Sequence, residues 1–159
     1  MSNRENVTIV SDASYNSRNK RAGFAFQMRY GRMHLKAYGP LKGKLENPTE
    51  AEMKSVLNAL HSLVKSDVKI HTLTIRTDCE FIVKHMFVEK KRKEVFQALI
   101  SKMREYLEIL DYTKLNIVHV RAHKTPENSA EYVNDWCDTH AKLGRRMAIP
   151  VCNVKWLTK

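Results

Sequence analysis

NVTIVSDAS, at residues 6–14, joins a β-branched run to an aspartate. The run from Val7 to Val10 favours a strand buried in a sheet, because β-branched side chains pack well on a pleated surface. Asp12 falls where that sheet is still crowded, and the turn that follows gives its carboxylate no helix to cap. The stretch therefore predicts a buried strand with an unexplained carboxylate near its end.

Two further strands follow a polar, basic turn. The alternating runs at 22–30 and 32–39 are separated only by Gly31, which is a hairpin signal. With the first strand they predict an antiparallel meander of three strands. A loop containing Gly and Pro then leads to position 49.

After Thr49 the hydrophobic period changes from two to three or four, which predicts a helix to about Lys65. A strand over 73–77 again ends on an aspartate, Asp78. A short helix, a long helix, a strand over 115–122 and a final helix ended by Gly144 at the C′ position follow. The helical stripes comprise Met53, Val56, Leu57, Leu60, Leu63 and Val64; Phe81, Ile82, His85 and Met86; Phe96, Leu99, Ile100, Met103, Leu107 and Leu110; and Val133, Trp136, Cys137, His140 and Ala141.

The order β-β-β-α-β-α-α-β-α predicts an α/β fold with a mixed sheet, because strands entered through helical crossovers lie parallel to a neighbour. The 159 residues are one domain's worth of chain. We expect a single domain over 1–159, with a Pro-interrupted tail at 145–159 that is either docked or disordered.

The formal charge of +11 favours a polyanionic partner, with simple solubility as the alternative. Cys79, Cys137 and Cys152 are odd in number and widely spaced, so a disulfide framework or zinc site is not expected. The N-terminus has no secretory apolar region, and no stretch is long and apolar enough to cross a membrane. We expect a soluble protein of the cytoplasm with no membrane partner.

Asp12 and Asp78 would lie about one strand spacing apart, about 5 Å, if their strands are parallel neighbours. Two ionised carboxylates at that distance repel, so one must be protonated or a cation must lie between them. The carboxyl ends of strands are also where α/β sheets usually bind ligands. Alternatively, Asp78 caps the following helix.

Other candidates are open to plainer interpretations. Glu52 lies at the edge of an apolar stripe and faces the sheet, but Thr49 and Glu52 also fit a capping box with Thr49 as N-cap. Asp138 pairs with Asn134 at helical spacing, as on any solvated helix surface. His123 is a surface histidine unless its context says otherwise.

Five motifs with these residues resemble the type 1 ribonuclease H family, including the ribonuclease H domains of reverse transcriptases. They are IVSDAS with Asp12, TEAEMKSVLNAL with Glu52, IRTDCEFI with Asp78, HVRAHK with His123, and NDWCDTHAK with Asn134 and Asp138. They follow the family's order and span nearly the whole chain. The resemblance implies a five-stranded mixed sheet with helices on both faces.

The resemblance also implies an enzyme. Asp12, Glu52, Asp78 and Asp138 would hold two Mg²⁺ ions, with Mn²⁺ as a substitute, and the enzyme would cut the RNA strand of an RNA–DNA hybrid to leave 5′-phosphate and 3′-hydroxyl ends. His123 would assist proton transfer or product release.

Three positions depart from the family's usual pattern. Ala13 follows Asp12 where many members have Gly, and Thr49 stands where many carry an Asn that reads ribose hydroxyls. Ten residues separate His123 from Asn134, which is more than usual. No departure removes a metal ligand.

Substrate contacts are expected from polar and basic side chains. Ser14, Asn16, Thr49 and Asn134 are candidates for reading the RNA strand. The run Lys90, Lys91, Arg92 and Lys93 is expected to bind DNA phosphates, where a solvated interhelical turn is the alternative.

Two other functions stay open. One is a DNA nuclease or junction resolvase with a similar acidic cluster, and the other is a nucleic-acid-binding module that has lost cleavage. The favoured expectation is a monomeric, magnesium-dependent endonuclease that acts on RNA–DNA hybrids.

Overall fold

In the computed structural model, residues 4–120, 129–147 and 150–156 are described. The strands are β1 (Glu5–Asn16), β2 (Arg21–Tyr30), β3 (Met33–Pro40), β4 (Ile70–Thr77), β5 (Lys114–His119) and β6 (Val151–Trp156). The helices are α1 (Pro48–Ser66), α2 (Glu80–His85), α3 (Glu94–Leu110) and α4 (Ser129–Arg145). The α/β fold class and the order of the first nine elements are therefore confirmed.

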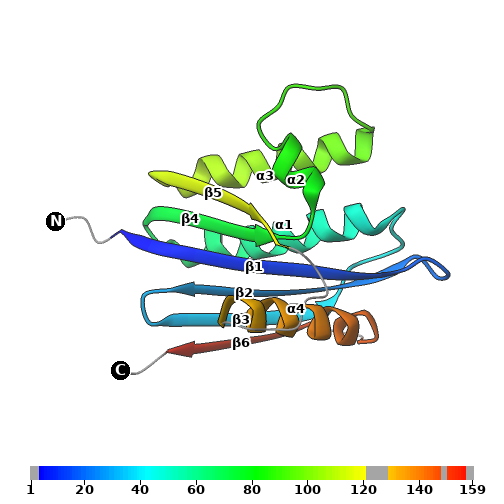
Figure 1. Cartoon of the computed structure of the whole chain (residues 1–159), viewed down its shortest axis with the longest axis horizontal. Coiled ribbons are helices and arrows are strands. Elements are labelled where there is room, and N and C mark those ends of the chain that lie inside the picture. The colour runs from blue at the N-terminus through cyan, green and yellow to red at the C-terminus, as the bar shows by residue number, and fades with distance from the viewer. Residues whose placement is uncertain (1–3, 121–128, 148–149, 157–159) are drawn as a thin grey trace.

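The mixed sheet has the strand order β5-β4-β1-β2-β3-β6 (Figure 1). Strand β1 lies at its centre, antiparallel to β2 and parallel to β4. The meander β1-β2-β3 follows from the two short turns, and the parallel pairs β1-β4 and β4-β5 follow from the helical crossovers. The NVTIVSDAS stretch thus forms the central strand, as its β-branched run predicts.

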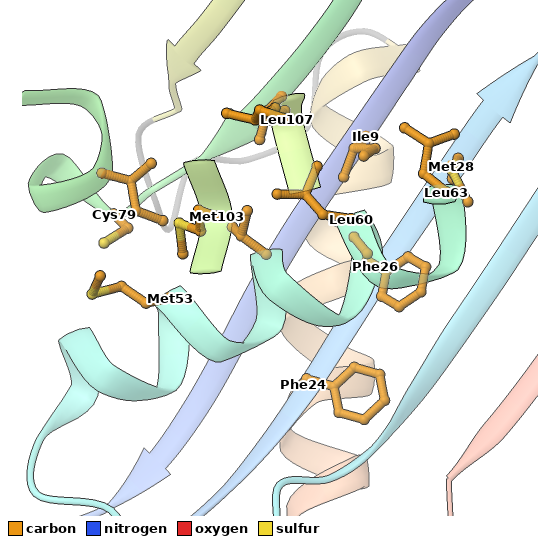
Figure 2. Packing of buried hydrophobic residues seen from close by; sticks show 14 of the residues in the cluster. Ile9, Phe24, Phe26, Met28, Met53, Leu60, Leu63, Cys79, Met103 and Leu107 are labelled. Carbon is orange, nitrogen blue, oxygen red and sulfur yellow. The ribbon is translucent and has the colours of Figure 1, made fainter. Parts of the chain in front are cut away.

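Helices cover both faces of the sheet. Helix α1 packs on β1 and β2 with α3 behind it, and α4 packs on the opposite face against β1, β2 and β3 (Figure 1). Figure 2 shows the larger core, where Phe26 and Met28 of β2 meet Leu60 and Leu63 of α1. These four side chains are almost fully buried, and each such burial contributes about 1.5–3 kcal/mol.

The expectation of five strands was wrong, because the tail supplies a sixth. Strand β6 pairs antiparallel with β3 and covers an edge that would otherwise present unpaired backbone groups. The chain turns into β6 at Pro150, where it crosses Gly39 so closely that a Cβ on this glycine would lie 2.5 Å from the Pro150 Cα. The tail is therefore docked as far as Trp156.

The end of α4 also differs from expectation. The helix continues to Arg145, so Gly144 lies inside its last turn and is not the C′ residue. A Cβ on Gly144 would lie 2.6 Å from the Gly39 carbonyl oxygen. Glycine is needed here because helix and strand backbones touch, not because the helix ends.

In the part of the chain that the structure describes, no helix combines the length and apolar character required to cross a membrane.

Candidate active site

Three carboxylates converge where the parallel pairing of β1 with β4 ends, although β1 itself continues beside β2. Ser11 of β1 lies in register with Thr77 of β4, so the next residues, Asp12 and Asp78, are neighbours across the parallel pair. Glu52 reaches them from the first half of α1. One carboxylate oxygen from each of the three residues lies within 4.8 Å of the others. The sequence-based expectation that these side chains meet is confirmed.

Buried hydroxyl groups align α1 with β1 at this point. Ser55, one turn after Glu52, donates a hydrogen bond to the Asp12 carbonyl oxygen at 2.8 Å and accepts one from the Ser11 hydroxyl at 2.7 Å. Ser55 is fully buried. Sequence reasoning missed it, although a serine on the buried side of an apolar stripe is itself a signal, because a buried hydroxyl needs partners.

The capping interpretation of Glu52 was wrong. The N-cap of α1 is Asn47, whose side-chain oxygen accepts a hydrogen bond from the Glu50 amide at 2.9 Å. Glu50 in turn accepts a bond from the Glu46 amide at 3.2 Å, so the acidic side chain that reaches back across the start of α1 is Glu50 and not Glu52. Thr49 therefore lies within the first turn of α1, and the Glu52 carboxylate is left for the acidic cluster.

The capping alternative for Asp78 is not observed either. The N-cap position of α2 belongs to Cys79, which makes no side-chain capping bond. The Asp78 Oδ1 atom is buried and has no hydrogen-bond partner among the described residues. A buried, unpartnered carboxylate oxygen is costly, and a metal ion would satisfy it.

Burial and mutual repulsion change the acidity of the cluster. Burial, with the charge of Asp78 next in importance, raises the pKa of Asp12 to about 8 and that of Glu52 to about 8. Burial also raises the pKa of Asp78. Without a cation, the cluster therefore holds protons at neutral pH. Oxygen ligands of this kind are those that hard divalent cations prefer, so the donor set fits such an ion.

Asp138 lies near the cluster but outside the group of three. Its negative charge contributes to the raised pKa of Asp12 and of Asp78, so Asp138 interacts electrostatically with both carboxylates. Its Oδ2 atom pairs with the Lys142 ammonium at 3.0 Å, one turn along α4. Asn134, one turn before Asp138, has a buried Oδ1 atom with no hydrogen-bond partner in the described ranges.

A histidine that the sequence reading passed over lies beside the cluster. His119 ends β5, and its Nε2 atom lies 3.2 Å from the Asp78 carbonyl oxygen. Its position follows from β5 running parallel to β4, which brings His119 into register with Thr77. The predicted catalytic histidine, His123, lies outside the described residues.

Two predicted substrate contacts already have partners within the chain. The Ser14 hydroxyl accepts a hydrogen bond from Arg145 Nη1 at 2.8 Å. The Asn16 side-chain oxygen accepts from the Arg18 amide at 2.9 Å, which stabilises the turn between β1 and β2.

The basic run between α2 and α3 contains three exposed lysines and one arginine that is bonded within the chain. Lys90, Lys91 and Lys93 are exposed, whereas Arg92 is half-buried and donates to Gln97 Oε1 at 2.8 Å and to the carbonyl oxygens of His85 and Val88. Arg92 therefore holds the interhelical segment together, and the three lysines present the charge.

Fold and site together define an α/β protein with a carboxylate cluster, able to hold a divalent metal, at the point where the pairing of its central parallel strands ends. A sequence model of the RNase H family matches residues 4–146, so the chain belongs to the RNase H family. Its enzyme class is accordingly that of the ribonucleases H. The comparison with curated protein sequences found no match.

Solved structures share the fold. RNase H1 from the halophilic archaeon Halobacterium salinarum is 14% identical with a TM-score of 0.67, over 87% of this chain and 96% of that one. LC11-RNase H1, isolated from compost by a metagenomic approach and solved in complex with an RNA/DNA hybrid, is 17% identical with a TM-score of 0.67, over 87% and 96%. The protease-reverse transcriptase of prototype foamy virus is 16% identical with a TM-score of 0.60, over 94% of this chain and 22% of that one.

Proposed function

We propose that this chain hydrolyses the RNA strand of RNA–DNA hybrids and leaves 5′-phosphate and 3′-hydroxyl ends. The observation that carries the proposal is the acidic cluster, with oxygens of Asp12, Glu52 and Asp78 within 4.8 Å of one another. Hybrid binding by LC11-RNase H1, which has the same fold, supports the substrate class.

The three carboxylates would hold Mg²⁺. When bound, a pair of such ions lowers the pKa of the attacking water and stabilises the leaving oxygen. The chain's own contribution is placement. The bond from Ser55 to the Asp12 carbonyl aligns α1 with β1, and the Ala13 amide donates to Asp12 Oδ1 at 2.8 Å to fix the carboxylate.

Asp138 is the proposed fourth ligand. To bind a metal ion, Asp138 must give up its ion pair with the Lys142 ammonium. An exposed ion pair one helical turn apart contributes only about 0.3–0.5 kcal/mol to stability. The exchange is therefore inexpensive. His123 remains the proposed group for proton transfer or product release, and Asn134 and Thr49 remain proposed contacts to the RNA strand.

The exposed lysines of the interhelical run are proposed to bind the DNA strand. Because Arg92 has a structural role, the informative variant replaces Lys90, Lys91 and Lys93 with Gln and keeps Arg92. Hybrid binding should weaken and its salt dependence should flatten, because binding releases fewer counterions from the nucleic acid when fewer phosphates are contacted. A salt slope equal to that of the wild type would refute this assignment.

The test of the function is strand-resolved cleavage. A hybrid labelled separately on each strand is incubated with and without Mg²⁺, beside duplex DNA and branched DNA. We expect shortening of the RNA strand alone, only with the metal, and none with the Asp12→Asn variant. Cleavage of branched DNA in preference to the hybrid, or cleavage by Asp12→Asn, would contradict the proposal.

A further inference from the structure

A basic pocket lies beyond the acidic cluster at the same end of the sheet. Its cavity of about 410 Å³ is formed by the start of β2, the loop after β3 and the end of α4, which Figure 1 shows close together. Arg21, Lys42 and Arg145 contribute to its lining, and no acidic residue does among those described. The pocket therefore offers cations to a ligand without a competing carboxylate.

The surroundings of the pocket add to this charge. The segments 18–21, 42–44 and 145–146 contain no Asp or Glu. Backbone hydrogen bonds join the first two segments, because the Leu45 amide donates to the Lys20 carbonyl at 2.8 Å and the Leu41 amide donates to the Ala22 carbonyl at 3.0 Å. The cations so gathered are Arg18, Lys20, Arg21, Lys42, Lys44, Arg145 and Arg146. Such crowding of like charge is unfavourable unless an anion joins it.

One of the lining arginines, Arg145, is held in place. The guanidinium of Arg145 is half-buried and donates to the Ser14 hydroxyl at 2.8 Å. The backbone under it is fixed as well, since a Cβ on Gly23 would lie 2.2 Å from the Arg145 nitrogen. Gly43, also in the lining, has a φ of +72° and open space where a side chain would stand. A fixed guanidinium in a pocket that is open at Gly43 suits a phosphate, which Arg binds with two parallel hydrogen bonds.

Two elements connect the pocket to the acidic cluster. Ser14 lies two residues beyond Asp12 on β1, a rise of about 7 Å. Arg145 lies seven residues beyond Asp138 on α4, a rise of about 10 Å. One strand of a duplex advances about 3.4 Å along the axis for each phosphate, so these rises correspond to a few nucleotides.

We propose that this pocket binds a backbone phosphate of the hybrid a few nucleotides from the cut. The inference rests on the proposed function, because it takes the acidic cluster as the point of cleavage. The pocket would contribute affinity and fix the position of the strand, without contacting the reacting atoms.

The first test measures hybrid binding as a function of salt for the variant Arg21→Gln/Lys42→Gln. Both side chains are exposed, so the fold should persist. Ca²⁺ replaces Mg²⁺ so that binding is measured apart from cleavage. We expect about tenfold weaker binding at moderate salt and a salt slope less negative by about 1. The matched control is Lys65→Gln/Lys69→Gln, two exposed lysines at the opposite end of the sheet, which should leave the slope unchanged.

The second test locates the phosphate. Hybrids are made with a single neutral methylphosphonate linkage at successive positions of either strand. The wild type should lose affinity at one position a few nucleotides from the cut, and Arg21→Gln/Lys42→Gln should respond to that linkage less strongly, because the lining cation Arg145 remains. The proposal is overturned if this variant keeps the wild-type salt slope or responds to every linkage as the wild type does. Failure of the proposed function would look different, because hybrids would bind through the pocket and remain uncut.

Discussion

Replacing Asp12 with Asn should make the metal-free protein more stable. The raised pKa of Asp12, about 8 against an ordinary 3.8, means that the folded state binds more protons than the unfolded state between these values. The free energy of unfolding of the metal-free wild type therefore falls as pH rises from about 4 to about 8. At pH 7 the 3.2-unit gap from 3.8 corresponds to about 4 kcal/mol, at 1.36 kcal/mol for each unit.

Asn keeps the shape of the side chain and removes its charge. Its oxygen can still accept from the Ala13 amide, but its own amide group is also partly buried and needs partners. We therefore expect a gain on the order of 2–4 kcal/mol at pH 7, which raises the melting temperature by roughly 5–15 °C for a chain of this length. Below pH 4 the advantage should disappear, because Asp12 is then protonated in both states.

Thermal unfolding followed by circular dichroism, in EDTA and in Mg²⁺, measures this prediction. Mg²⁺ should stabilise the wild type and not Asp12→Asn, since a ligand stabilises only the state that binds it. The control is Asp135→Asn, an exposed carboxylate on α4, which should change neither quantity. If Asp12→Asn melts at or below the wild-type temperature in EDTA at pH 7, the electrostatic reasoning is refuted.

Three further substitutions test the supports of the site. Ser55→Ala should lower the free energy of unfolding in urea by about 1–3 kcal/mol, because it leaves the Asp12 carbonyl and the Ser11 hydroxyl without their buried partner. The control, Ser62→Ala on the same helix, should lower it much less. Asn47→Ala should cost about 1 kcal/mol and Thr49→Ala less than half of that; the reverse ranking would restore Thr49 as the cap. Gly144→Ala should cost about 1–3 kcal/mol or more, because the added Cβ collides with the Gly39 backbone. The control is Leu143→Ala, an exposed neighbour that should leave the melting temperature unchanged. If Gly144→Ala also leaves it unchanged, the two backbones are not in contact.

The meeting of Asp12 and Asp78 could be predicted because it depends on strand order and on where the parallel pairing ends, even though β1 continues beyond that point. The sequence prediction placed the start of α1 two residues late, because the Thr-x-x-Glu pattern resembled a capping box. Asn47 followed by Pro48 is an equally typical helix start, with Asn as N-cap and Pro at N1. The same pattern hid the true partner of the cap, Glu50.

Other features depend on packing between distant segments, which periodicity does not reveal. The pairing of β6 with β3 needs an open sheet edge that only the folded meander presents. Gly144 resembles a helix terminator in sequence, and its actual role depends on the approach of Gly39 from 105 positions earlier in the chain. His119 becomes a neighbour of Asp78 only through the register of β4 with β5.

The central claim is that the acidic cluster binds a divalent cation that displaces protons. Calorimetric titration with Mg²⁺ at pH 7, in two buffers with different ionisation enthalpies, tests it most directly. We expect binding accompanied by release of about one to two protons, because metal ligation requires the ionised carboxylates, and we expect Asp12→Asn to lose both. Binding that releases no protons and persists in Asp12→Asn would contradict the account.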